Sequence, residues 1–110
     1  MFEKAVEIDK TNPWALFRLG WIYIRNGDKL RGIENLKKSL SYDPDNADVL
    51  TKLGEVLMRD NHSYDEAEGY LRKALEIDGN IPDALVSMGR IYEKKGNVDE
   101  AVKCYEKALK

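Results

Sequence analysis

The residues that could support catalysis or metal binding are few and far apart in this sequence. His62 is the only histidine and Cys104 the only cysteine, and neither has a neighbour of the kind that completes a metal site or activates a nucleophile. The acidic residues Asp65, Glu66 and Glu68 are closely spaced, but they fall in the first turn of an expected helix, where negative charge complements the helix dipole. We therefore expect His62 to be a surface loop residue, Cys104 a passive thiol, and the chain to hold no catalytic, cofactor-binding or metal site.

Composition is typical of a folded domain and argues against several classes of partner. Hydrophobic residues make up 43% and charged residues 35% of the 110 residues. The 18 basic and 20 acidic residues leave a net charge of −2, a poor match for nucleic acid or anionic lipid. No apolar run approaches the roughly 20 residues that cross a bilayer, and the N terminus lacks the apolar core of a signal peptide. We expect a cytoplasmic protein, with a nuclear location as the alternative, and neither nucleic acid nor membrane as partner.

A pattern of residues repeats along the chain. The pair Leu19-Gly20 recurs as Leu53-Gly54 and as Met88-Gly89, at spacings of 34 and 35 residues. Small residues recur in phase at Gly32, Ala67 and Ala101, and again at Ser39, Ala74 and Ala108. A fixed period of this length is the signature of a helical repeat array.

Each repeat unit has the pattern of two helices joined by a turn. Leu16, Leu19, Gly20 and Tyr23 are spaced i, i+3, i+4, i+7, which is the period of a helix. Helices are expected over residues 1–9, 13–25, 29–42, 64–77, 82–95 and 99–110, with one more in the first half of the unit 47–81. No segment alternates as a strand does, so the sequence predicts seven helices and no sheet.

Capping and turn residues mark the helix ends. Asn12-Pro13 supplies a cap and a first-turn proline, and Gly27-Asp28 supplies a left-handed helix end followed by a cap. The run Ser63-Tyr64-Asp65-Glu66 has the spacing of a capping box. Gly96-Asn97 separates the last two helices, with Asn97 as the expected cap.

Three glycines lie inside expected helices at the same phase of the repeat. Glycine in a helix costs about 1 kcal/mol relative to alanine, so Gly20, Gly54 and Gly89 need a reason. We expect each to allow close approach of the partner helix, against the small residues at the other two phases. No phosphate-binding glycine loop is present, since the remaining glycines fall in the repeat or in turns.

This pattern resembles the tetratricopeptide repeat. The matching residues are Leu16, Leu19, Gly20, Tyr23, Gly32, Leu36, Ser39 and Pro44 in the first unit; Leu50, Leu53, Gly54, Leu57, Ala67, Leu71 and Ala74 in the second; and Leu85, Met88, Gly89, Tyr92, Ala101, Tyr105 and Ala108 in the third. The resemblance implies an all-α, right-handed superhelical solenoid of antiparallel helix hairpins. It would form a single array: residues 1–12 as the second helix of a partial repeat, then repeats at 13–46, 47–81 and, truncated, 82–110.

The sequence departs from the family pattern at two places. The second unit has one extra residue in the stretch 59–63, which predicts a longer turn between its helices. Gly79 stands where a proline is usual, which predicts a looser junction to the third unit.

The chain begins and ends within repeat units, so we expect an excised piece of a longer protein. Residues 1–9 match a second helix, and Ala101, Tyr105 and Ala108 lie where a following helix would dock. The alternative is a natural mini-protein whose exposed end pairs with another copy.

The resemblance implies a ligand groove lined by the first helix of each repeat. The groove positions that we expect to bind a partner are Trp14, Phe17, Arg18, Trp21, Ile24, Arg25, Lys52, Glu55, Arg59, Arg90 and Lys94. In the first helix, Trp14, Phe17, Trp21 and Ile24 form a second apolar face at i, i+3, i+7, i+10. Either a partner's apolar side chains cover this face, or helix 1–9 or a preceding hairpin does.

Basic residues recur in the same rows and also have two readings. Arg18 and Lys52 in one phase, and Arg25, Arg59 and Lys94 in another, could bind the carboxylates of an acidic peptide. Alternatively they form a solvated face, neutralised by Asp48, Glu55, Asp83 and Glu93. Some members of the family bind the C-terminal carboxylates of heat-shock chaperones, but the matching positions here are Phe17, Trp21, Lys52, Asp83 and Ser87, and none has the required side chain.

The sequence therefore predicts a non-enzymatic scaffold that binds a peptide or helix of a partner protein in its concave groove, with no cofactor. Two alternatives remain open. The chain could be a regulatory or substrate-selecting arm of a larger enzyme or complex, or it could be a module for homo-oligomerisation through its exposed terminal faces.

Overall fold

The computed structural model describes residues 12–59 and 63–110. Six helices and no strand occur in these ranges, which confirms the expected all-α class. The helix expected over residues 1–9, like His62, lies outside the described residues. The helices are α2 (Pro13–Arg25), α3 (Lys29–Tyr42), α4 (Ala47–Met58), α5 (Tyr64–Ile77), α6 (Pro82–Lys94) and α7 (Val98–Ala108).

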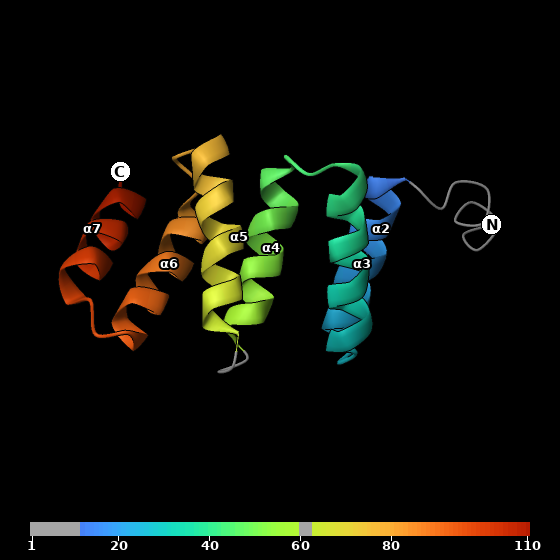
Figure 1. The fold of residues 1–110 in the computed structure, drawn as a ribbon, viewed down its shortest axis with the longest axis horizontal. Helices are drawn as coiled ribbons and strands as arrows, with labels where there is room; N and C mark the ends of the chain where they lie inside the picture. Colours follow the sequence, from blue (N-terminus) through green and yellow to red (C-terminus); the bar gives the residue numbers. More distant parts are fainter. Residues whose placement is uncertain (1–11, 60–62) are drawn as a thin grey trace.

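Consecutive helices pair into three hairpins, α2–α3, α4–α5 and α6–α7, which stack side by side (Figure 1). Each hairpin packs on the next, through α3 against α4 and through α4 and α5 against α6. The stack measures 50 × 26 × 20 Å. This is the expected solenoid of antiparallel hairpins, whose units bury their apolar faces only by stacking.

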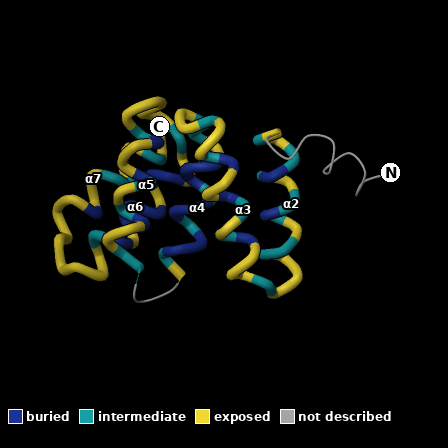
Figure 2. Tube along the Cα trace, turned by 45° about the vertical axis from the view of Figure 1, so that its right-hand side comes forward, coloured by how far each residue is buried: buried dark blue, intermediate teal, exposed yellow. Residues whose placement is uncertain are grey.

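The hydrophobic core runs through the stack without a break. Leu36 of α3, Leu53 of α4, Leu71 of α5 and Ile91 of α6 are all fully buried. They belong to one cluster that spans four helices, and buried residues are most frequent on α4 and α6 (Figure 2). Because the cluster crosses hairpin boundaries, the repeats hold one another in a fixed relation, and residues on α4 and α6 keep their spacing.

The helix-interior glycines lie where helices approach closely, as expected. A Cβ on Gly20 would come within 2.9 Å of the backbone oxygen of Gly32, so two small residues face each other in the first hairpin. The other two glycines correct the expectation. A Cβ on Gly54 would meet Leu71 at 2.5 Å, and one on Gly89 would meet the ring of Tyr105 at 2.6 Å. In these two hairpins a large side chain, and not the small residue, packs over the glycine. Leu71 lies one helical turn beyond Ala67, and Tyr105 lies one turn beyond Ala101.

Helix ends follow the expected caps in the first hairpin and depart from them later. The side chains of Asn12 and Asp28 accept hydrogen bonds from the backbone N–H groups of Ala15 and Arg31, and Gly27 has the left-handed φ of 91°. Ser63 and Asn97 occupy the N-cap positions, as predicted, but neither side chain makes the expected capping hydrogen bond. Ser63 has ψ of 21° rather than the extended conformation that aims a cap side chain at the helix.

The second hairpin has the longer connection that its extra residue predicts. Five residues separate α4 from α5, against three between α2 and α3 and three between α6 and α7. None of the six helices is long and apolar enough to cross a bilayer.

Candidate functional site

The first part of the candidate site is an aromatic patch on α2, made of Trp14, Phe17 and Trp21. Trp14 is 65% exposed, and its ring centroid lies 6.0 Å from that of Phe17, which is half-buried against the core. The Arg18 guanidinium lies 5.9 Å from the centre of the Trp14 ring. An exposed indole held between a second ring and a cation is a preorganised surface for apolar or cation–π contact.

Trp21 links the patch to the next repeat. The Lys52 ammonium of α4 lies 4.7 Å from the centre of the Trp21 ring, which is half-buried. The first two rows of predicted groove positions are therefore adjacent. Lys52 also lies 3.8 Å from the carboxylate of Glu55.

Glu55 stands midway along the groove in a partly desolvated position. Burial raises the pKa of its carboxyl, and the nearby Asp83 charge of α6 raises it further, whereas Lys52 and Arg59 oppose the shift. The carboxylate of Asp83 on α6 is therefore close enough to interact electrostatically with that of Glu55 on α4. The second and third rows of groove positions are also adjacent.

Two predicted groove residues are not brought to these clusters. Ile24 packs between α2 and α3, because the missing side chain of Gly32 leaves space that the Ile24 Cγ1 atom occupies. Arg25 is exposed at the end of α2, and no ion pair or ring contact involves it within the part of the chain that the structure describes.

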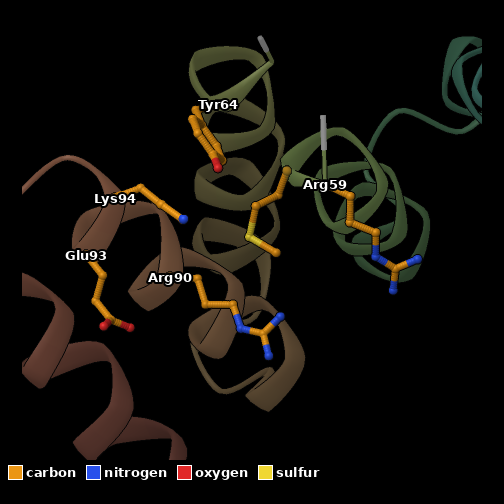
Figure 3. A pocket seen from close by; sticks show the side chains of 6 residues that line it. Arg59, Tyr64, Arg90, Glu93 and Lys94 are labelled. Carbon is orange, nitrogen blue, oxygen red and sulfur yellow. The ribbon is translucent and has the colours of Figure 1, made fainter. Parts of the chain in front are cut away.

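The other part of the site is a pocket of about 610 Å³ between the ends of α4 and α6 (Figure 3). Its lining comprises Met58, Arg59, Tyr64, Arg90, Glu93 and Lys94. It adjoins a smaller pocket of about 210 Å³, which shares Met58, Arg59 and Arg90 and also reaches Glu55 and Asp83. Sequence reasoning missed Tyr64, since this residue begins a second helix and the family's groove positions are on first helices.

Glu93 is held away from the basic side chains of this pocket. Its carboxylate accepts a hydrogen bond from the Tyr105 hydroxyl of α7, and Figure 3 shows it pointing away from Arg90 and Lys94. Burial and this hydrogen bond raise the pKa of Tyr105 to about 12, so the hydroxyl stays a donor at physiological pH.

Two models of known protein families match the sequence of this chain. The tetratricopeptide repeat family model matches residues 45–110, and a second model of the same description matches residues 1–34. This chain belongs to the tetratricopeptide repeat family.

The chain spans only part of the length of the relatives that it matches. It is 34% identical over 97% of its length to a barley (Hordeum vulgare) protein, a probable UDP-N-acetylglucosamine–peptide N-acetylglucosaminyltransferase, SPINDLY, and spans 12% of that protein. It is 32% identical over 98% of its length to the antiviral innate immune response effector IFIT1 of Macaca fascicularis, of which it spans 24%. The crystal structure of MamA superposes with a TM-score of 0.87 at 32% identity, covering 98% of this chain and 63% of that one.

The tetratricopeptide groove of this chain carries different side chains at the positions used for chaperone carboxylates. Lys52 lies over Trp21, Ser87 is buried, and Asp83 places a negative charge beside Glu55.

Cys104 of this tetratricopeptide array is half-buried on α7. Burial, and secondarily the charge of Glu100, raise the pKa of its thiol, which lowers the thiolate fraction at pH 8. In residues 12–59 and 63–110, no three His, Cys, Asp or Glu side chains are grouped so that they could hold a metal ion.

Alkylation of Cys104 by iodoacetamide at pH 8 is therefore expected to be slower than that of a short cysteine peptide. The rate should rise as the pH increases through the raised pKa, because only the thiolate reacts. Mass spectrometry against time measures it, and denaturation in urea should bring the rate to that of the peptide. A folded protein that reacts as fast as the peptide would contradict the passive role.

Proposed function

We propose that this chain is a protein-interaction scaffold that binds a peptide or helix of a partner in the groove lined by α2, α4 and α6. Tetratricopeptide repeat domains are generally protein–protein interaction modules, and the groove of this one carries side chains suited to that role. The observation that carries the proposal is the aromatic patch, in which Trp14 is 65% exposed and the Lys52 ammonium lies 4.7 Å from the centre of the Trp21 ring.

The energetic reason is the area that a tryptophan can bury. A Trp side chain offers roughly 150–250 Å² of contact surface, and interface hot spots are enriched in Trp, Tyr and Arg. Arg18 and Lys52 flank the two indoles, so a ligand meets apolar surface bordered by positive charge. Because the patch is on a helix fixed by the shared core, little conformational entropy is lost there on binding.

Replacing Trp14 and Trp21 together with alanine is expected to weaken capture of the groove's partner by tenfold or more, since each hot-spot residue contributes about 2 kcal/mol. Immobilised wild-type and variant chains are compared by quantitative mass spectrometry of the captured proteins. The matched control is Leu30→Ala with Tyr42→Ala, which removes two exposed apolar side chains from α3. Equal recovery of the same proteins by the wild type and the tryptophan variant would remove the aromatic patch from the binding site.

A second function, as a regulatory or substrate-selecting arm of a larger enzyme, is supported by the barley relative, a probable glycosyltransferase of which the chain spans 12%. The complete reading frame tests it. A catalytic domain in frame with these repeats is the expected result, and a frame that encodes helical repeats alone would contradict it.

A further inference from the structure

We propose that the pocket between α4 and α6 binds carboxylate side chains from an acidic segment of the partner peptide. Arg59, Arg90 and Lys94, which we call the cationic triad, form the binding group. The inference rests on the proposed function, because it assigns the charge of the segment that lies in the C-terminal half of the same groove.

The triad makes no ion pair in the described residues, although the charge of Arg59 does act on the Glu55 carboxyl. Some basic side chains elsewhere in the described chain are paired, as Lys37 is with Glu66 at 3.0 Å and Lys95 with Asp65 at 2.8 Å, whereas others, such as Arg25, are not. Within residues 12–59 and 63–110, no ion pair involves Arg59, Arg90 or Lys94. Three cations around one pocket repel one another, and an anion between them removes that repulsion.

The one acidic residue of the pocket lining does not neutralise the triad. Glu93 accepts the Tyr105 hydroxyl hydrogen bond and points away from Arg90 and Lys94 (Figure 3). Glu93 is thus hydrogen-bonded to α7, and Arg90 and Lys94 are the positively charged side chains that the last turns of α6 contribute to the pocket. The pocket volume of about 610 Å³ is sufficient for more than one carboxylate side chain.

The surroundings favour carboxylates over a phosphate group. Glu55 and Asp83 line the adjoining smaller pocket, which shares Arg59 and Arg90 with the larger one. The charge of Asp83 raises the pKa of Glu55, so negative potential is already present at this edge. A phosphate concentrates its charge on one group, whereas separate carboxylates of an acidic segment can each approach one cation of the triad.

The triad and the aromatic patch together define a two-part ligand. The patch is on α2, and the triad is at the ends of α4 and α6, which pack against each other. Lys52 over Trp21 joins α2 to α4, so both parts belong to one continuous surface. The expected ligand has an apolar side chain for the aromatic patch, followed or preceded by acidic residues for the triad.

Three fluorescein-labelled peptides test this assignment. Each has one tryptophan in a Gly-Ser background; the first adds three consecutive glutamates, the second replaces these with glutamines, and the third replaces the middle glutamate with phosphoserine. Fluorescence anisotropy measures affinity, and NMR follows the Nε–Hε signals of Arg59 and Arg90. The glutamate peptide is expected to bind about tenfold more tightly than the glutamine peptide, since each exposed charge pair contributes about two- to fivefold. The preference should fall as NaCl is raised from about 50 to about 500 mM.

The variant Arg90→Gln with Lys94→Gln is expected to abolish the preference for glutamate, while Arg31→Gln with Lys38→Gln on α3 leaves it unchanged. Glutamate and glutamine peptides that bind equally well through the aromatic patch would overturn the inference and leave the proposed function standing. Loss of the preference in the α3 variant, or an absence of shifts at Arg59 and Arg90, would also overturn it. A phosphoserine peptide that binds more than tenfold tighter than the glutamate peptide would overturn the assignment to carboxylates.

Discussion

Gly32→Ala is expected to destabilise the fold by about 2 kcal/mol, whereas Gly69→Ala is expected to stabilise it by about 1 kcal/mol. Both substitutions add one methyl group to a helix-interior glycine. They differ in what that methyl group meets. A Cβ at Gly32 would lie 2.3 Å from Cγ1 of Ile24 and 2.8 Å from the backbone oxygen of Gly20, while one at Gly69 would meet nothing within 4 Å.

The sign at Gly32 follows from the kind of atom contacted. The Gly20 oxygen belongs to the backbone of α2, so relief of the contact requires the two helices of the hairpin to separate. Overpacking of this kind typically costs 1–3 kcal/mol or more, which exceeds the helix-propensity gain of about 1 kcal/mol. At Gly69 only the propensity gain remains.

Urea denaturation followed by circular dichroism measures both effects, with an unchanged m-value as evidence that the unfolding reaction is the same. The Gly69 variant serves as the control for the general effect of glycine replacement in this protein. If Gly32→Ala raised stability as Gly69→Ala does, the close approach of α2 and α3 would not constrain the first repeat.

Periodicity predicted the architecture well because solenoid packing is dictated by short-range patterns. The glycines at 20, 54 and 89 are each needed where two neighbouring helices touch, and sequence alone places those helices next to each other. The extra residue in the second unit could likewise be placed in the turn between α4 and α5, because lengthening either helix would disturb the phase of the core residues.

Features that depend on side-chain direction were predicted less well. The i, i+3, i+7, i+10 pattern assigned Ile24 to the aromatic face, but Ile24 instead fills the space that Gly32 leaves. Ser63 has the capping-box spacing, but its backbone angles do not aim its hydroxyl at the helix. A spacing pattern predicts which face of a helix a residue is on, but it does not predict the space that its side chain finds there.

One part of the candidate binding surface could be predicted from the sequence, and another part could not. Trp14, Trp21 and Lys52 could be named from the family's groove positions, and the structure places Trp21 against Lys52. The pocket at the ends of α4 and α6 required the structure, since Tyr64 reaches it from a second helix and Glu93 is turned away by a hydrogen bond from α7. Neither contact is local in sequence.

Leu71→Ala is expected to destabilise the protein by about 3 kcal/mol, within the range of 2–5 kcal/mol found for buried leucines. Leu71 is fully buried on α5 and belongs to the core cluster shared by the hairpins. Thermal or urea unfolding measures the loss. A loss below about 1 kcal/mol would mean that the core around α5 rearranges to fill the cavity.

Leu71→Ala is also expected to remove the destabilisation that Gly54→Ala causes in the wild type. In the wild type, Gly54→Ala should destabilise by about 1–3 kcal/mol, because its Cβ would meet Cγ and Cδ2 of Leu71 at 2.5 and 2.7 Å. Leu71→Ala removes both atoms and leaves the Ala67 oxygen, at 3.3 Å, as the nearest neighbour. In that background Gly54→Ala should be neutral or stabilising by up to about 1 kcal/mol.

A double-mutant cycle measures the difference as a coupling free energy of at least about 1 kcal/mol between positions 54 and 71. Additive effects would show that Gly54 is disfavoured for a reason other than the Leu71 side chain. A coupling of the expected sign would establish that the preference for glycine at position 54 depends on the Leu71 side chain. Gly89 faces the Tyr105 ring in the same way. The third hairpin would then be expected to depend on the same kind of contact, between a helix-interior glycine and a large side chain of the partner helix.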